Sequence, residues 1–139
     1  MSSTIFAFPG SEKLARGVSE ALGIALGTLA LHRFPDGESL VRIETPVAGQ
    51  RTALVCTLRD PDTRILPLLF AARQLRDAGA ASVGLVAPYL AYMRQDQRFH
   101  AGEALTSVEF ANLISTRFDW LVTVDPHLHR FARLEELYR

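Results

Sequence analysis

The 139-residue sequence has one cysteine, one tryptophan, one lysine and no excess of either charge. A single cysteine excludes an intramolecular disulfide, which is typical of the reducing cytosol, so we expect a cytoplasmic location. Cys56 lies in the apolar run 52–57 and is predicted to be a small core residue. Because 15 basic residues balance 15 acidic ones, bulk charge gives no basis for binding nucleic acid or an anionic membrane.

Long apolar runs and glycine-rich phosphate loops are also missing. No stretch approaches 18 uninterrupted apolar residues, and residues 1–4 have no leader character, so neither a membrane span nor a secretory signal is expected. Neither common glycine-rich phosphate-binding pattern occurs, so a nucleotide must be held in another way. Arginine accounts for every basic residue except Lys13, and its planar guanidinium suits bidentate recognition of phosphate.

Apolar runs alternate with helical periodicity along the chain. Strands are predicted at 5–8, 29–34, 40–44, 52–57, 82–87 and 120–124, and helices at 12–22, 62–78, 106–116 and 131–138. Ser11 and Gly23 are the expected start and stop of the first helix, and Thr106 or Ser107 is the expected cap of the third. Several strands are apolar throughout, which indicates an α/β domain whose parallel sheet is flanked by helices on both faces.

A turn signal, Pro35-Asp36-Gly37, separates two of the predicted strands. The strand after it alternates polar and apolar residues, so these two strands are predicted to form a hairpin that projects from the main body. At its tip, Phe34 lies beside Asp36 and Glu38, an arrangement suited to stacking on a purine ring and accepting from its exocyclic amine. A surface turn with a partly buried Phe34 is the alternative.

A polar segment, 93–103, follows the predicted strand 82–87, at an edge of the sheet where α/β folds bind ligands. It contains Arg94-Gln95-Asp96-Gln97-Arg98. Guanidinium groups pair with phosphate oxygens, and glutamine can read a base edge or a ribose hydroxyl. Tyr89 and Tyr92 precede this segment and either pack against it or stack with a ligand. The alternative is a solvated charged loop.

A second polar segment, Asp125-Pro126-His127-Leu128-His129, follows the predicted strand 120–124. A carboxylate and two imidazoles in this position suit a divalent ion or a proton relay. The spacing of two places His127 and His129 on the same side of an extended segment. The alternative is that Asp125 caps a helix and that the other residues belong to an ordinary loop.

Together these segments resemble the ribose-phosphate pyrophosphokinase family, also called phosphoribosyl pyrophosphate synthetases, over residues 5–127. Residues 33–38 are similar to its adenine-binding flag, 88–96 to its ATP-binding loop, and 123–127 to its magnesium-placing strand and histidine. Ala104-Leu105-Thr106-Ser107, followed by Ala111-Asn112-Leu113, matches the start of a family helix. The resemblance implies a phosphoribosyltransferase-like fold and transfer of the β,γ-diphosphate of ATP to ribose 5-phosphate, which releases AMP.

The resemblance also implies roles for individual residues. Phe34 stacks on adenine while Asp36, Gly37 and Glu38 contact it, and this flag serves a neighbouring subunit, so we expect a homo-oligomer. Arg94 and Gln95 bind ATP within the subunit, and His127 contributes to a Mg²⁺ site. These implied site residues are Phe34, Asp36, Gly37, Glu38, Arg94, Gln95 and His127; the resemblance names no catalytic residue within this sequence.

The sequence departs from the family in three ways. Phe99 and His100 stand where many members have charged residues, and Pro126 replaces an aliphatic residue. The family's second domain, with its pentose-phosphate loop, is absent from the sequence, which stops in mid-pattern at Arg139. We therefore interpret residues 1–139 as the amino-terminal, ATP-binding half of an enzyme whose missing domain binds ribose 5-phosphate, and expect the isolated chain to be inactive. The alternatives are a non-catalytic nucleotide-binding or oligomer-assembly module, or an oligomer-forming domain without a ligand.

Overall fold

Five strands form one parallel sheet in the order β2-β1-β5-β6-β7, and β3 and β4 form a separate antiparallel hairpin. The computed structural model describes all 139 residues. The strands are β1 (Ser3–Ala7), β2 (Ala25–Gly27), β3 (Leu29–Arg33), β4 (Ser39–Ile43), β5 (Arg51–Val55), β6 (Ser82–Val86) and β7 (Trp120–Val122). The helices are α1 (Glu12–Leu22), α2 (Pro61–Asp77), α3 (Thr106–Ser115) and the 3-10 turn η1 (Leu134–Glu136). The predicted fold class and hairpin are confirmed.

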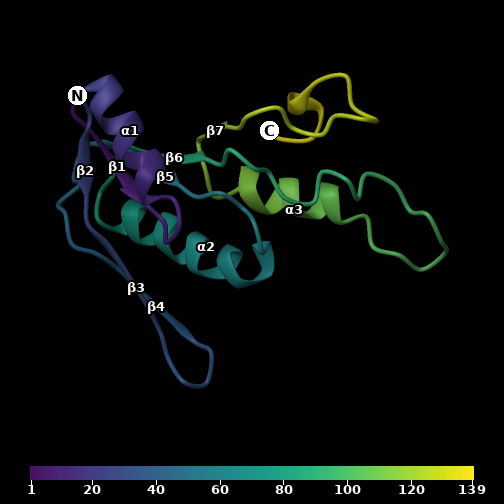
Figure 1. Cartoon of the computed structure of the whole chain (residues 1–139), viewed down its shortest axis with the longest axis horizontal. Coiled ribbons are helices and arrows are strands. Elements are labelled where there is room, and N and C mark those ends of the chain that lie inside the picture. Colours follow the sequence, from purple (N-terminus) through teal and green to yellow (C-terminus); the bar gives the residue numbers. More distant parts are fainter.

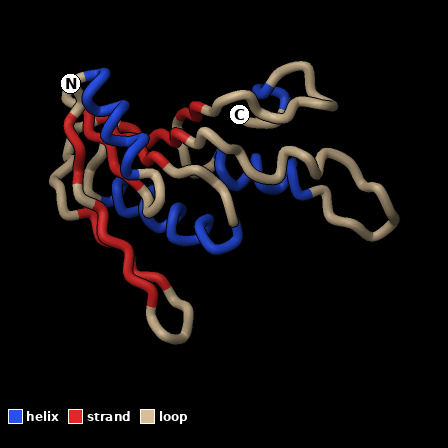
Figure 2. The backbone as a smooth tube through the Cα atoms, in the orientation of Figure 1, coloured by secondary structure: helices blue, strands red, loops and turns tan.

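Helices cover both faces of the sheet (Figures 1 and 2). On one face, Ala15 of α1 packs with Ile5 and Val55 in a small buried cluster. On the other, α2 and α3 pack over Phe6 and Leu54 within a core of 22 buried residues. Because successive strand residues point to opposite faces, a sheet buried on both sides needs apolar residues at every position. This is why successive residues are apolar at positions 5–7 of β1 and 53–55 of β5.

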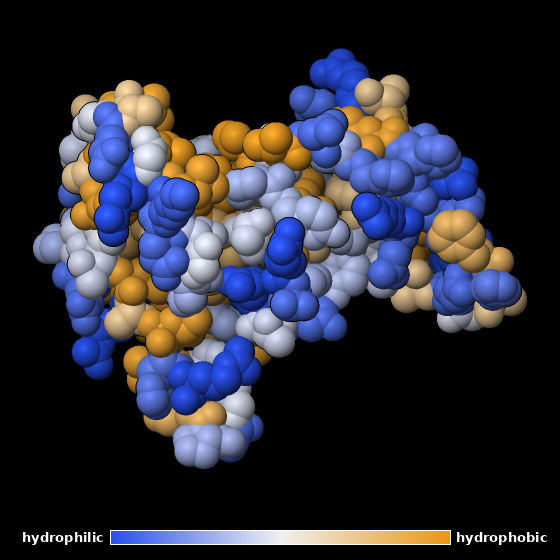
Figure 3. All heavy atoms as spheres, viewed as in Figure 1, coloured by the Kyte–Doolittle hydropathy of each residue, from blue (hydrophilic) through white to orange (hydrophobic).

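Apolar and hydrophilic side chains are unevenly distributed over the surface. On the face shown in Figure 3, apolar side chains gather over the sheet and the base of the hairpin, whereas the outer loop region on the right is mainly hydrophilic. None of the helices is long and apolar enough to cross a membrane.

The structure adds one strand that the sequence pattern does not predict. β2 has only three residues, pairs with β1 alone at the edge of the sheet, and leaves Ala25 and Leu26 exposed. Gly27 ends it, and a Cβ atom there would lie 2.3 Å from the ring of Phe6. A strand of three residues is too short to show the periodicity on which strand prediction depends.

The helix predicted over 131–138 is wrong, since only the single 3-10 turn η1 forms there. The segment is held by its side chains, because Leu137 and Tyr138 are buried in the main core. The amide of Arg139 also donates to the hydroxyl of Ser115 in α3, at 3.0 Å. Short helices gain little from their own hydrogen bonds, so packing against α3 decides the conformation here.

The β3–β4 hairpin packs along α2 at its base and closes with a turn at its tip. Its apolar residues Leu31 and Val41 pack against the main core, whereas Leu40 and Arg42 are exposed, so the predicted one-sided strand is confirmed. At the tip Gly37 has a φ of +92°, a conformation that favours glycine. The hairpin projects from the sheet, as Figure 1 shows.

Arg33 fastens the hairpin tip to α2. Its guanidinium donates to the carbonyl of Gly37 at 3.3 Å and to the carbonyl of Thr63, in the first turn of α2, at 3.0 Å. In a regular helix the amide of residue 67 would bond to the Thr63 carbonyl, but residue 67 is a proline within α2 and has no N–H. Pro67 thus frees the acceptor that Arg33 uses.

Arg33→Ala is expected to loosen the hairpin tip without unfolding the domain. Loss of two solvent-exposed charge-assisted bonds, worth about 1 kcal/mol together, should raise amide exchange at the tip about fivefold. Hydrogen exchange read by NMR measures this, with protection in β5 and β6 unchanged. Arg42→Ala is the matched control, since Arg42 is an exposed hairpin arginine whose one ion pair, at 3.7 Å, is with Glu44 directly after β4. Equal exchange in both variants would contradict the fastening role.

Candidate functional site

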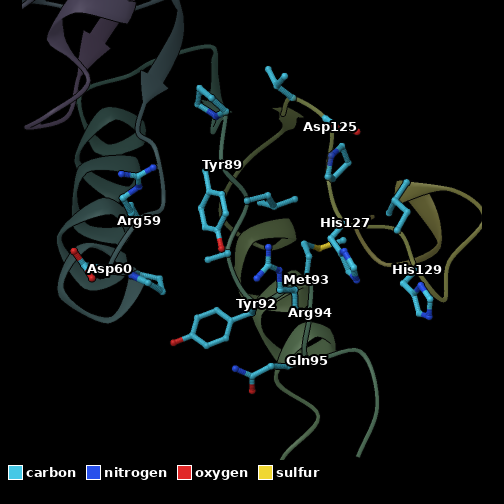
Figure 4. Close-up of a pocket in the computed structure, with 17 residues that line it drawn as sticks. Arg59, Asp60, Tyr89, Tyr92, Met93, Arg94, Gln95, Asp125, His127 and His129 are labelled. Atoms are coloured by element: carbon cyan, nitrogen blue, oxygen red, sulfur yellow. The ribbon is translucent and has the colours of Figure 1, made fainter.

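A cavity of about 800 Å³ opens beyond the carboxyl ends of β5, β6 and β7 (Figure 4). Three chain segments line it: 59–61 after β5, 88–95 after β6, and 124–129 after β7. Each leaves the sheet at the same edge because the strands are parallel. This edge is where open α/β sheets bind ligands.

The backbone of each lining segment holds one non-glycine residue in a left-handed conformation. These are Asp60 with φ of 50°, Tyr92 with φ of 61° and Asp125 with φ of 47°, and the chain has no others. Such conformations cost of order 1–3 kcal/mol each and cluster at functional sites. Their presence in all three segments identifies this cavity as the strongest candidate site in the chain.

Arg94 and Gln95, two of the predicted ATP ligands, both line the cavity. The Arg94 side chain is exposed and makes no hydrogen bond or ion pair within the chain. Gln95 is held in place, since its side-chain oxygen accepts from the hydroxyl of Thr106 at 2.7 Å and its carbonyl accepts from the amide of Ser107 at 3.2 Å. The nitrogen of the Gln95 side-chain amide has no partner and can donate to a ligand.

The predicted cap of the third helix is wrong. Leu105 is the N-cap residue of α3, and no side chain caps that helix. The hydroxyl of Thr106 donates to Gln95 instead, and the hydroxyl of Ser107 is buried without a partner. The first residues of α3 therefore support the cavity segment rather than their own helix.

The outer part of the 93–103 segment folds around Glu103, away from the cavity. The Glu103 carboxylate accepts from the His100 ring at 2.8 Å and from the amides of Phe99 and His100 at 2.9 and 3.1 Å. These bonds, that of the His100 side chain first, hold the pKa of Glu103 below its ordinary value. Arg98 donates to the Glu103 carbonyl at 2.9 Å. This part of the segment is hence a structured turn and not a loose loop.

Tyr89 and Tyr92 differ in their environments. Tyr92 packs its ring against Phe110, with ring centroids 5.0 Å apart, and its hydroxyl donates to the carboxylate of Asp62 in α2. That hydrogen bond, with smaller contributions from burial and charge, raises the pKa of Tyr92. Tyr89 is 49 % exposed in the cavity wall. Tyr92 therefore has a packing role, and Tyr89 is the ring free to meet a ligand.

Asp96 joins two of the cavity segments. Its carboxylate is 4 % exposed, and one oxygen accepts from Nε of Arg130 at 3.2 Å while the other is buried without a partner. Asp96 follows Arg94 by two residues, and Arg130 follows His129 directly. The pair thus connects the predicted ATP loop to the predicted histidine segment.

His127 and His129 both line the cavity, and their rings stack with centroids 5.8 Å apart. The expectation that they share a side is confirmed. No helix begins after Asp125, so the alternative in which Asp125 acts as a helix cap is wrong. No group of three His, Cys, Asp or Glu side chains is arranged to hold a metal ion. Mg²⁺ prefers several oxygen ligands, so the chain's side chains alone do not form a magnesium site.

The flag residues lie elsewhere. Phe34, Asp36, Gly37 and Glu38 are at the exposed hairpin tip, and none of them lines the cavity. The Phe34 ring is 39 % exposed and contacts His32 edge-on, with centroids 4.8 Å apart. The carboxylate of Asp36 accepts from the amide of Glu38 at 3.0 Å, which stabilises the turn. The structure thus does not bring the two predicted halves of an ATP site together within one chain.

Sequence reasoning missed the first cavity segment, which contains Arg59 and Asp60. Its signal was present, because polar residues after the strand 52–57 obey the same rule that drew attention to the segments after the next two strands. Residues 59–61 lie between the predicted strand 52–57 and the predicted helix 62–78, and the sequence analysis assigned them no role.

Cys56 takes no part in the cavity. It is fully buried, and burial raises the pKa of its thiol to about 11 despite the opposing effect of Arg64. The protonated thiol is not a nucleophile at neutral pH. The prediction of a structural core cysteine is confirmed.

Comparison with known proteins places the chain in a family. Residues 3–117 match a family model described as the N-terminal domain of ribose phosphate pyrophosphokinase. The chain is 40 % identical over 119 residues to a ribose-phosphate pyrophosphokinase of Halobacterium salinarum, covering 84 % of this chain and 41 % of the relative. A ribose-phosphate pyrophosphokinase 1 of Streptococcus pneumoniae is 34 % identical over 125 residues, with 88 % and 39 % covered.

The fold agrees with this placement. The phosphoribosylpyrophosphate synthetase from Mycobacterium smegmatis superposes with a TM-score of 0.85 at 24 % identity, over 93 % of this chain and 44 % of that one. The chain spans about two fifths of the length of the relatives it matches. Because the family model covers most of the chain, this protein belongs to the ribose-phosphate pyrophosphokinase family and corresponds to its N-terminal domain.

Proposed function

We propose that the cavity binds the phosphate chain of ATP and that this chain is the nucleotide-binding half of a diphosphokinase. The complete enzyme transfers the β,γ-diphosphate of ATP to the 1-hydroxyl of ribose 5-phosphate, which releases AMP. One observation carries the proposal: Arg94 presents an unpaired guanidinium in a cavity at the ligand-binding edge of the sheet. Transfer of this kind depends mainly on positioning and charge neutralisation, which arginine provides.

The flag is proposed to supply the adenine contacts from a neighbouring subunit. Support comes from the exposure of Phe34 and from its place outside the cavity of its own chain. A ring that is 39 % exposed can stack on a purine without rearrangement, and Asp36 and Glu38 beside it can accept from an amine. The arrangement requires a homo-oligomer.

His127 is proposed to be the side-chain ligand that this chain offers to Mg²⁺. Since the chain contains no ready-made set of metal-binding side chains, the other ligands would be phosphate oxygens, water or residues outside this chain. When bound, the ion neutralises charge on the phosphates. The chain's own contribution is to hold the phosphate chain with Arg94, to donate from the amide of Gln95, and to keep both loops in place through Asp96.

Ribose 5-phosphate is proposed to bind residues outside this chain, so the isolated chain is expected to be inactive. The relatives it matches are more than twice as long, which leaves room for an acceptor-binding half. Formation of phosphoribosyl pyrophosphate by the isolated chain, from ATP and ribose 5-phosphate, would overturn this part of the proposal.

Arg94→Ala is expected to weaken binding of a non-hydrolysable ATP analogue about tenfold. A charge-assisted hydrogen bond to phosphate contributes about 1.5 kcal/mol or more, and 1.4 kcal/mol corresponds to a factor of ten. Isothermal titration calorimetry measures the affinity. Arg16→Ala is the matched control, because Arg16 is an exposed, unpaired arginine on α1 away from the cavity. Unchanged affinity in Arg94→Ala would rule out this site for the phosphates.

A further inference from the structure

We propose that Arg59 is a second phosphate-binding residue, so that the phosphate chain of the nucleotide lies between Arg59 and Arg94. The inference rests on the proposed function and extends it to a residue to which neither the sequence analysis nor the family resemblance assigned a role. Arg59 belongs to the segment between β5 and α2, and Arg94 to the segment between β6 and α3. In Figure 4, Arg59 comes from the α2 side of the cavity and Arg94 from the side where His127 lies.

The side chain of Arg59 has no partner inside the protein. Like Arg94, it is exposed in the cavity wall and makes no hydrogen bond or ion pair. Nearby arginines are committed, because Arg98 donates to the Glu103 carbonyl and Arg130 pairs with Asp96. The two arginines that line the cavity are therefore the two that remain free to bind an anion there.

The backbone that carries Arg59 is fixed by a neighbouring arginine. The guanidinium of Arg64 donates to the Arg59 carbonyl at 2.8 Å and to the Pro9 carbonyl at 2.7 Å. This bridge ties the segment after β5 to the loop after β1. Asp60 then takes its left-handed conformation, and Pro61 begins α2. The backbone of Arg59 is thus held in place, while the guanidinium of Arg59 has no partner.

The two cavity arginines come from separate loops, which suits an extended anion better than a single small one. Asp60 and Asp125 also line the cavity, yet neither forms an ion pair with either arginine. A triphosphate has several anionic oxygens along its length, and guanidinium groups bind such oxygens bidentately. Two guanidiniums from separate loops can hold different phosphates of one chain, which fixes its direction across the cavity.

The test measures affinity for inorganic tripolyphosphate, a non-hydrolysable ATP analogue and AMP by isothermal titration calorimetry. The variants are Arg59→Ala, Arg59→Lys and Arg94→Ala, with Arg16→Ala as the control. We expect Arg59→Ala to weaken tripolyphosphate and the ATP analogue about tenfold each and to leave AMP unchanged, and Arg59→Lys to recover part of the loss. The circular dichroism spectrum and thermal midpoint establish that each variant is folded.

The outcomes separate this inference from the proposed function. If Arg94→Ala loses affinity and Arg59→Ala does not, the role of Arg59 is overturned and the ATP site stands. A third outcome is that the wild-type chain binds tripolyphosphate but not the ATP analogue, and that Arg59→Ala loses tripolyphosphate binding. This outcome supports the phosphate site and overturns ATP as its ligand. A wild-type chain that binds neither ligand overturns both.

Discussion

Arg130→Ala is expected to lower the free energy of unfolding by about 3 kcal/mol, a large effect for a partly exposed residue. The cause lies in Asp96, whose carboxylate is 4 % exposed and has Arg130 as its one hydrogen-bonding partner. Removing one member of a buried ion pair leaves the other charge buried without compensation, at a cost of about 3–5 kcal/mol. Because Arg130 is 41 % exposed, water relieves part of this cost, and the lower end of the range applies.

Chemical denaturation gives the size of the effect, and two comparisons give its cause. Arg133→Ala removes a neighbouring arginine whose pair with Glu135, at 3.6 Å, is largely exposed, and should cost less than about 0.5 kcal/mol. In an Asp96→Asn background the buried charge is gone, so Arg130→Ala should cost at least about 1 kcal/mol less than in the wild type. An equal cost in both backgrounds would mean that Arg130 acts through packing and not through Asp96.

The same pair bears on ligand binding. Asp96 belongs to the segment that carries Arg94 and Gln95, and Arg130 belongs to the one that carries His127 and His129. These segments follow different strands, β6 and β7, and next to the sheet the amide of Val124 and the hydroxyl of Thr123 both donate to the Pro88 carbonyl, at 3.3 and 3.4 Å. The Asp96–Arg130 pair joins the same segments farther out, beyond Gln95 and His129. A site must hold its ligands within a fraction of an ångström, so this ion pair is a positioning element of the cavity.

Residues that mark the ends of helices made part of the fold predictable. The first helix runs from Glu12 to Leu22 as expected, because Gly23 takes the left-handed conformation that ends it. The predicted start of this helix at Glu12 is also correct, but the predicted cap by the Ser11 side chain is not. The Ser11 hydroxyl makes no capping bond and instead accepts from the amide of Thr57 at 3.1 Å, which joins the loops after β1 and β5. Sequence patterns thus locate an element before they explain its contacts.

Contacts between distant segments limited the prediction of the site. Arg94, Gln95 and His127 lie in one cavity as expected, because each follows a strand of the same parallel sheet. The sequence gives no sign that Arg64 reaches both Arg59 and Pro9, or that Asp96 meets Arg130. Such contacts depend on how whole loops are positioned in the folded structure. Arg59 was consequently missed, although its place after a strand is of the same kind.

Gly84→Val is expected to destabilise the domain by about 3 kcal/mol and to displace Trp120. Gly84 in β6 lies beside Trp120 in β7, and a Cβ atom on Gly84 would lie 1.9 Å from the indole ring. No side chain fits in that space unless the indole moves, and overpacking of this kind costs about 1–3 kcal/mol, with branched residues at the upper end. The glycine is therefore required by the close approach of the tryptophan.

Trp120 reports on its own displacement, because it is the chain's one tryptophan and is already 40 % exposed. Its fluorescence emission should shift to longer wavelength in Gly84→Val, and urea denaturation should give the loss of stability. Gly17→Ala is the matched control, since nothing lies within 4 Å of a Cβ atom at that helical position, and it should be neutral or slightly stabilising.

The displacement should also reach the cavity. Trp120 begins β7, and the segment with His127 and His129 follows that strand directly, so Gly84→Val should weaken ATP-analogue binding without altering any ligand-contacting residue. A Trp120→Ala background removes the clash, and there Gly84→Val should cost less than about 1 kcal/mol and leave affinity unchanged. If Gly84→Val lowers the stability equally in both backgrounds, its effect does not come from a clash with the indole of Trp120. The proposed link from β7 to the cavity is then also wrong.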